Sequence, residues 1–189
     1  MTNYLLSIDP SIKNTGFTLW EKECEVNCKY LWKPVESNTP HTNDIWRPIW
    51  LSSYNFKNYN YENYMEFIHN IILNKVDGLY WEQLSLCIEK GFINKGKGKE
   101  TLEHLRGFIA GWFNKLITKD MLVHNLTWKK WYIDNNITNI SLRNWNKKIS
   151  EDICFYLNEK YEWNITISNH DEADSLLIGW YYLNNKENK

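Results

Sequence analysis

Four acidic residues occupy positions from which their side chains could act together. Asp9 directly follows a short apolar run near the N-terminus, and Glu89 ends a second, compact apolar run. Asp171 and Asp174 are three residues apart at the start of a helical pattern, so they share one face of that helix. Carboxylates from two strand ends and one helix would form an oxygen-rich pocket suited to Mg²⁺ or Mn²⁺. Two such ions about 4 Å apart can activate water and stabilise the leaving oxygen of a phosphodiester.

Each of these acids also has a purely structural explanation. Asp9 precedes a proline and could belong to a turn, Glu89 could pair with a nearby lysine, and Asp171 could be a helix N-cap. Taken one at a time, the structural explanation is the better one. The order and spacing of the four acids change that judgement, because they match those of a known family.

Strand and helix patterns alternate along the chain and would position these acids. Apolar runs predict strands at residues 4–8, 16–20, 30–32, 84–88 and 121–126. Apolar residues at helical spacing predict helices at residues 61–73, 102–117, 128–133, 142–157 and 171–183. Loops are predicted at residues 33–50, which hold three of the four prolines, and at residues 94–99, which read NKGKGK. Together these patterns predict one mixed α/β domain over residues 1–189, with helices flanking a sheet.

The charge is unevenly distributed, although the whole chain carries a net charge of −1. Residues 90–148 contain 12 lysines and arginines against 4 acids, a local net charge of +8, and the remainder carries −9. This asymmetry predicts a basic surface for a polyanion beside an acidic region. A solvated face in a lysine-rich protein explains the same distribution equally well.

Composition and the N-terminal sequence predict a soluble, cytoplasmic protein. Eleven Trp and 12 Tyr, with few Gly and Pro, are typical of a folded globular chain. The first residues lack the basic start and long apolar segment of a signal peptide. No stretch approaches the roughly 20 apolar residues that a membrane span needs. We therefore expect no association with a membrane.

Most cysteines and tryptophans are expected to serve the core. Cys87 and Cys154 lie in apolar patterns and are predicted to be buried thiols. Cys24 and Cys28 could begin a zinc site, but no second pair of Cys or His completes it at a usual spacing. Core positions are also predicted for the tryptophans in apolar helical patterns: Trp112, Trp128, Trp131, Trp145 and Trp180.

The acidic segments resemble those of the RuvC-type Holliday junction resolvases of the RNase H-like superfamily. LLSIDPSIKNTGF is similar to the opening strand and turn of that family, with Asp9 as the first acid and Ser11 in place of the usual glycine. CIEKGF is similar to the family's I-E-x-x-F, and LEHLRGFIAGWF to its helix with an R-G pair. HDEADSLLIG is similar to D-x-A-D-A-L. The resemblance spans nearly the whole chain, and three acidic motifs in this order form a specific signal.

This resemblance implies an RNase H-like fold with a central mixed five-stranded sheet. It also implies a Holliday junction resolvase, a magnesium-dependent endonuclease that cuts four-way DNA in recombination, repair or the processing of replication intermediates. Two Mg²⁺ ions per site, with Mn²⁺ as a substitute, would be bound by Asp9, Glu89, Asp171 and Asp174. A homodimer would bring two such sites to the two strands of a junction. The short chain and its composition also suit a phage or viral member, which would act where that DNA is processed inside the cell.

Basic and aromatic residues are expected to contact the DNA. Phe92 matches the family's aromatic that pushes against bases near the junction centre, and such stacking is worth roughly 1–3 kcal/mol. Either Lys147 or Lys148 matches a lysine near the catalytic acids, and the sequence does not choose between them. Further contacts are predicted for Lys95, Lys97, Lys99, Arg106, Lys129 and Lys130. For any single lysine, an exposed side chain without a role is as good an explanation.

Two other functions compete with the nuclease. A protein that binds branched DNA without cutting it would share the basic region, but acids placed against phosphates without metal ions would weaken binding. An actin-like ATPase would share a strand, an Asp and a Gly-containing turn at its start. The chain is too short for the duplicated body of such ATPases, and no second phosphate loop follows.

Overall fold

The computed structural model describes residues 4–11, 14–23, 45–55, 61–76, 83–90 and 98–186. Its described strands form one five-stranded sheet in the order β3-β2-β1-β4-β5. The strands are β1 (Tyr4–Asp9), β2 (Thr15–Glu23), β3 (Ile45–Tyr54), β4 (Leu84–Lys90) and β5 (Leu122–His124). The pairs β1–β2 and β2–β3 are antiparallel, whereas β1–β4 and β4–β5 are parallel. The predicted mixed five-stranded sheet is therefore confirmed.

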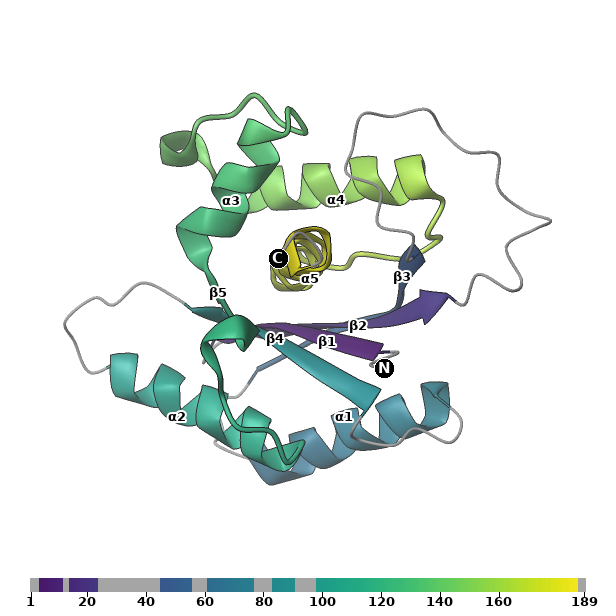
Figure 1. The fold of residues 1–189 in the computed structure, drawn as a ribbon, viewed down its shortest axis with the longest axis vertical. Helices are drawn as coiled ribbons and strands as arrows, with labels where there is room; N and C mark the ends of the chain where they lie inside the picture. The colour runs from purple at the N-terminus through teal and green to yellow at the C-terminus, as the bar shows by residue number, and fades with distance from the viewer. Residues whose placement is uncertain are drawn as a thin grey trace.

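Helices cover both faces of this sheet (Figure 1). On one face lie α1 (Tyr61–Lys75) and α2 (Gly98–Trp112). On the other face α5 (His170–Lys186) lies against β1 and β2, and α4 (Lys147–Tyr161) packs on the outer side of α5. A shorter helix, α3 (Asn125–Asp134), continues directly from β5. Within the described residues, no helix is long and apolar enough to cross a membrane.

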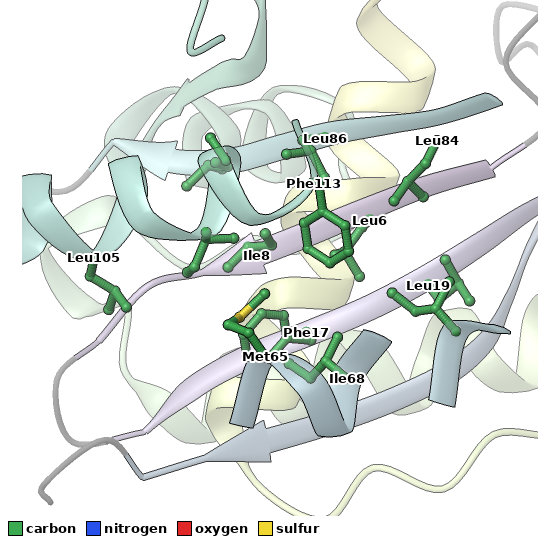
Figure 2. Packing of buried hydrophobic residues seen from close by; sticks show 14 of the residues in the cluster. Leu6, Ile8, Phe17, Leu19, Met65, Ile68, Leu84, Leu86, Leu105 and Phe113 are labelled. Carbon is green, nitrogen blue, oxygen red and sulfur yellow. The ribbon is translucent and has the colours of Figure 1, made fainter. Parts of the chain in front are cut away.

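The face toward α1 and α2 is mainly apolar. Because side chains alternate along a strand, every second residue of β1, β2 and β4 points to this face. These positions hold Leu6, Ile8, Phe17, Leu19, Leu84, Leu86 and Ile88, all of them buried. Met65 and Ile68 of α1 and Leu105 of α2 pack onto them (Figure 2). This cluster is one hydrophobic core of the protein.

The face toward α5 combines a second core with polar residues. Leu5, Trp20 and Cys87 pack there against α5, and buried Trp128 and Tyr132 of α3 belong to the same cluster. Cys154 is also buried in it, so Cys87 and Cys154 are both buried thiols, as predicted. The five tryptophans predicted to be core residues are all buried or packed against one of the two clusters. Ser7, Asp9, Thr18 and Glu89 lie on this same face by strand alternation, and all four are buried.

The prediction of a loop at residues 33–50 was wrong for its last part, because Ile45–Tyr54 form strand β3. Pro48 misled it, since proline cannot donate to a central ladder. Here Pro48 lies on an edge strand, next to an irregularity where the register with β2 shifts between Leu19 and Trp20. The strand predicted at residues 30–32 lies outside the described residues.

The other differences concern element ends. Helix α2 begins at Gly98, so the predicted loop gives way to helix there, and the helix ends five residues earlier than predicted. The predicted strand at residues 121–126 is shorter, because Asn125 and Leu126 already belong to α3. The predicted helix at residues 142–157 divides into a 3-10 turn (Leu142–Asn144) and α4, whose N-cap Asn146 accepts from the Ile149 amide. Helix α5 begins at His170, one residue before the predicted start.

Candidate active site

Asp9 and Glu89 lie at the ends of neighbouring parallel strands. Asp9 is the last residue of β1, and Glu89 lies near the end of β4, one residue beyond the pair Ile8 and Ile88. Strand alternation turns both carboxylates toward α5, away from the apolar face. Both residues are buried, with exposed fractions of 9% for Asp9 and 6% for Glu89. Each is a buried acidic group near the end of its strand.

The start of α5 carries the other two acids. Its N-cap is Asn169, whose Oδ1 accepts hydrogen bonds from the backbone amides of Asp171 at 3.0 Å and Glu172 at 3.1 Å. The suggestion that Asp171 itself caps the helix is therefore wrong. Asp174 lies one turn further along the same face.

Gly16 allows this helix to approach the sheet. It pairs with Asp9 in the β1–β2 ladder. A side chain at position 16 would overlap the backbone carbonyl of Asp171, so only glycine leaves room for the first turn of α5 here. The close approach brings Asp171 over the end of β1.

Burial and acidic neighbours raise the pKa of two of the four carboxylates, Asp9 and Asp174. The pKa of Asp9 is raised well above its usual value, first by burial and then by the charge of Glu89 and a hydrogen bond with it. The charges of Asp174 and Asp171 raise it further. Burial also raises the pKa of Asp174 to about 7, with contributions from Glu89 and Asp171, while Ser150 and Lys129 act in the opposite direction. Acids from β1, β4 and α5 therefore form one electrostatic cluster.

Two carboxylate oxygens in this cluster are buried without a hydrogen-bond partner: Asp171 Oδ2 and Asp174 Oδ1. The other oxygen of Asp171 lies 3.2 Å from His170 Nε2. Among the described residues, no three His, Cys, Asp or Glu side chains are already arranged as a ligand group for a metal ion. The donor set nevertheless fits a hard divalent cation, because carboxylate oxygens are its preferred ligands and two buried ones have no other partner.

Glu89 is held by two residues whose role the sequence did not reveal. Asn125, the first residue of α3, donates a hydrogen bond from Nδ2 to Glu89 Oε1. Arg106 of α2 donates from Nε to the backbone carbonyl of Glu89 at 2.9 Å and pairs through Nη1 with Glu103 at 2.8 Å. Arg106 is only 3% exposed, so the structure places it as a support for the end of β4 and not on the surface expected for a DNA contact.

The predicted lysines lie in different surroundings. Lys129 on α3 acts on Asp174 through its charge, and its Nζ lies 4.9 Å from the ring centroid of Trp128. Lys130, its neighbour, is exposed. Lys147 and Lys148 are exposed in the first turn of α4, and Lys148 pairs with Asp152 at 3.2 Å. Of these four lysines, Lys129 is the one whose charge lowers the pKa of an acid in the cluster, Asp174.

Some predicted site residues lie outside the described part of the chain. Phe92, Lys95 and Lys97 fall between β4 and α2, in residues 91–97. Lys99 belongs to the first turn of α2, but its side chain is not described. The roles proposed for these four residues stay predictions.

Solved structures with a similar fold exist, although no protein-family model and no curated protein matches the sequence. The Thermus thermophilus RuvC structure aligns over 95% of this chain and 95% of its own, with 11% identity and a TM-score of 0.50. The T. thermophilus RuvC in complex with Holliday junction substrate aligns over 95% and 94%, with 11% identity and a TM-score of 0.49. The fowlpox virus Holliday junction resolvase aligns over 95% and 96%, with 16% identity and a TM-score of 0.40. The sheet order and the first of these alignments together show that this chain has the RNase H-like fold.

Proposed function

We propose that this protein is a metal-dependent endonuclease that cuts branched DNA, four-way junctions above all. One observation carries the proposal: Asp9 and Glu89 lie at the ends of neighbouring parallel strands beside the start of α5, where Asp171 and Asp174 each keep a buried oxygen without a hydrogen-bond partner. A cluster of four ionised acids destabilises a fold unless bound protons or cations neutralise it. This arrangement favours a nuclease over a protein that only binds DNA, because unneutralised acids would repel phosphates.

Divalent cations such as Mg²⁺ or Mn²⁺ would be held by Asp9, Glu89, Asp171 and Asp174. When bound, two such ions would lower the barrier of phosphodiester hydrolysis by activating water and stabilising the leaving oxygen. One oxygen of Asp171 and one of Asp174 support this assignment. Both are buried without a hydrogen-bond partner in the described structure and could therefore bind a metal ion.

The surrounding residues would keep this site in place and attract the substrate. Asn125 orients the carboxylate of Glu89, and Arg106 fixes its backbone. Lys129 offsets part of the negative charge of Asp174 and is suited to hold a phosphate beside it. Lys130, Lys147 and Lys148 extend the positive charge over exposed parts of α3 and α4, where flanking phosphates would lie.

The preference for four-way junctions rests on the resemblance of the acidic motifs to the RuvC-type resolvases. The RNase H-like fold agrees with it but is shared by enzymes of many activities. A homodimer would present two equivalent sites about a twofold axis, which suits the paired strands of a junction. Each cut would leave a 5′-phosphate and a 3′-hydroxyl.

A substrate panel tests the proposal. Labelled four-way junction, flap, bubble and linear DNA are incubated with Mg²⁺ and with the wild type, Asp9→Asn or Asp134→Asn. Asp134 is a matched control, because it is an exposed acid at the end of α3. The wild type and Asp134→Asn should cut the junction fastest and leave nicks that a ligase seals. Asp9→Asn should be slower by more than about a hundredfold, since metal binding supplies several kcal/mol of transition-state stabilisation.

Two outcomes would contradict the proposal. Unchanged cleavage by Asp9→Asn would remove this acid from the reaction. Tight junction binding by the wild type without cleavage in either Mg²⁺ or Mn²⁺ would identify a DNA-binding protein instead.

A further inference from the structure

Three residues line up across the sheet beneath the first turn of α5. Asp9 pairs with Gly16 in the β1–β2 ladder, and Gly16 pairs with Ser53 in the β2–β3 ladder. The side chains of directly paired residues point to the same face, so Asp9 and Ser53 both face α5, with Gly16 between them. The middle of the row lacks a side chain, and the two ends can reach the helix.

Ser53 is bonded to the N-cap of α5. Asn169 Nδ2 donates to Ser53 Oγ at 2.7 Å, while Asn169 Oδ1 accepts from the amides of Asp171 and Glu172. The side chain of Asn169 thus connects Ser53 of β3 to the backbone of Asp171, a predicted metal ligand. The cap does more than end the helix, because its second group fixes where the helix begins relative to the sheet.

Glu172 completes this connection from the helix side. It is only 6% exposed, and its Oε1 accepts from Ser53 Oγ at 3.3 Å and from Asn169 Nδ2 at 3.4 Å. Its Oε2 accepts from the Ser168 amide at 2.8 Å. Both carboxylate oxygens of Glu172 therefore accept hydrogen bonds. Asp171 and Asp174, in contrast, each keep a buried oxygen without a hydrogen-bond partner.

The start of α5 needs such a connection to the sheet, because it carries two acids of the cluster. Like charges on Asp9, Glu89, Asp171 and Asp174 repel one another, and this repulsion pushes the start of α5 away from the ends of β1 and β4. Gly16 leaves room for the helix but cannot hold it there. Further along α5, Ser7 and Thr18 bond to Ser175, but these contacts lie one turn beyond Asp171.

We propose that Ser53, Asn169 and Glu172 form a clamp that positions Asp171 against Asp9 and so sets the affinity of the site for divalent cations. These three are positioning residues, and the inference rests on the proposed function. Removing a residue that supports a metal ligand typically costs about 10- to 100-fold in metal affinity or activity. The clamp should therefore be visible in metal binding alone, without DNA.

Mn²⁺ affinity is measured by isothermal titration calorimetry on four variants of the full chain. Ser53→Ala removes the hydroxyl that joins Asn169 and Glu172, and Ser53→Thr keeps it. Asn169→Ser keeps a good N-cap but loses the amide donor. Ser52→Ala is the matched control, because Ser52 lies next in β3, pairs with Phe17 and faces the opposite side of the sheet.

Ser53→Ala and Asn169→Ser should bind Mn²⁺ about tenfold more weakly. Ser53→Thr and Ser52→Ala should bind as the wild type does. Helical circular dichroism should be the same for all four, because the variants leave the helix capped. The weaker variants should also need proportionally more Mn²⁺ for half-maximal junction cleavage, with the same rate at saturation.

The two proposals fail differently in this experiment. If the wild type binds Mn²⁺ and cuts junctions while folded Ser53→Ala does both equally well, the clamp is overturned and the proposed function stands. If the wild type binds no Mn²⁺, the metal-dependent function is overturned, and the clamp falls with it.

Discussion

The two faces of the central sheet are built from the same strands but differ in polarity. Toward α1 and α2, β1 presents Leu6 and Ile8, which are both fully buried in an apolar cluster. Toward α5, the alternate residues Ser7 and Asp9 of the same strand are also buried but polar. A single strand thus supplies apolar core residues on one side and, on the other, an acid that we propose as a metal ligand.

The difference between the faces lies in how their buried groups are satisfied. The apolar face needs only close packing. On the α5 face, Ser7 Oγ accepts a hydrogen bond from Trp20 Nε1 at 2.9 Å and donates one to the Ser175 carbonyl at 2.7 Å. This buried hydroxyl therefore has a partner for both its donor and its acceptor. The acids at the end of that face are not fully paired, and two of their oxygens have no hydrogen-bond partner. Among the described residues, these two oxygens are the carboxylate atoms that are buried without a partner, and they lie where we propose that cations bind. In the same part of the chain, the Nε1 groups of Trp46 and Trp128 are the other buried side-chain polar atoms without a partner.

The largest effect on stability is expected from the apolar face. Phe17→Ala removes a fully buried ring from the cluster between the sheet and α1, and such truncations cost about 3–5 kcal/mol. Urea denaturation should show this loss in the free energy of unfolding. Asp9→Asn, on the polar face, should not destabilise the metal-free protein, because it removes a buried charge from a cluster of acids. An equal loss of stability in both variants would contradict this division of the faces.

A smaller effect, dependent on pH, is expected from Asp174. Its pKa in the folded protein is about 7, against 3.8 for the ordinary carboxyl group. Between these values the folded state binds more protons than the unfolded state, so stability is highest at low pH and falls as the pH rises toward 7. A shift of about three pH units corresponds to up to about 4 kcal/mol.

Urea denaturation in EDTA at pH 5.5 and pH 8 measures this effect. The wild type should be less stable at pH 8, and Asp174→Asn should show a smaller difference between the two conditions. Asp134→Asn serves as the control, since Asp134 is exposed. Saturating Mn²⁺ should restore wild-type stability at pH 8. An identical pH dependence in Asp174→Asn and the wild type would mean that Asp174 is not buried among like charges.

The sequence predicted the apolar framework and the strand ends well, because both follow from local pattern. Asp9 and Glu89 could be placed at strand ends from the apolar runs that precede them. The polar residues that support the acids could not be found in this way. Asn125 and Asn169 are ordinary polar residues in the sequence, and only the folded chain brings them to Glu89 and Ser53. A helix cap can be predicted from residues close in the sequence. The hydrogen bond between Asn169 and Ser53 joins residues 116 positions apart, and no local pattern predicts it.

Arg106 connects the two faces, and its variants give the smallest of the three effects. It belongs to α2 on the apolar side, yet its guanidinium reaches the backbone of Glu89 at the edge of the polar face. Arg106→Gln should lower the free energy of unfolding by about 1.5–3 kcal/mol, because it removes hydrogen bonds made by a buried charged group. Junction affinity in Ca²⁺ should keep its dependence on salt concentration, since a buried arginine neutralises no phosphate. A stable Arg106→Gln variant whose salt dependence falls by about one unit would instead identify Arg106 as a DNA contact. The same measurement on Lys130→Gln provides the comparison, because Lys130 is exposed and its loss should reduce the salt dependence without affecting stability.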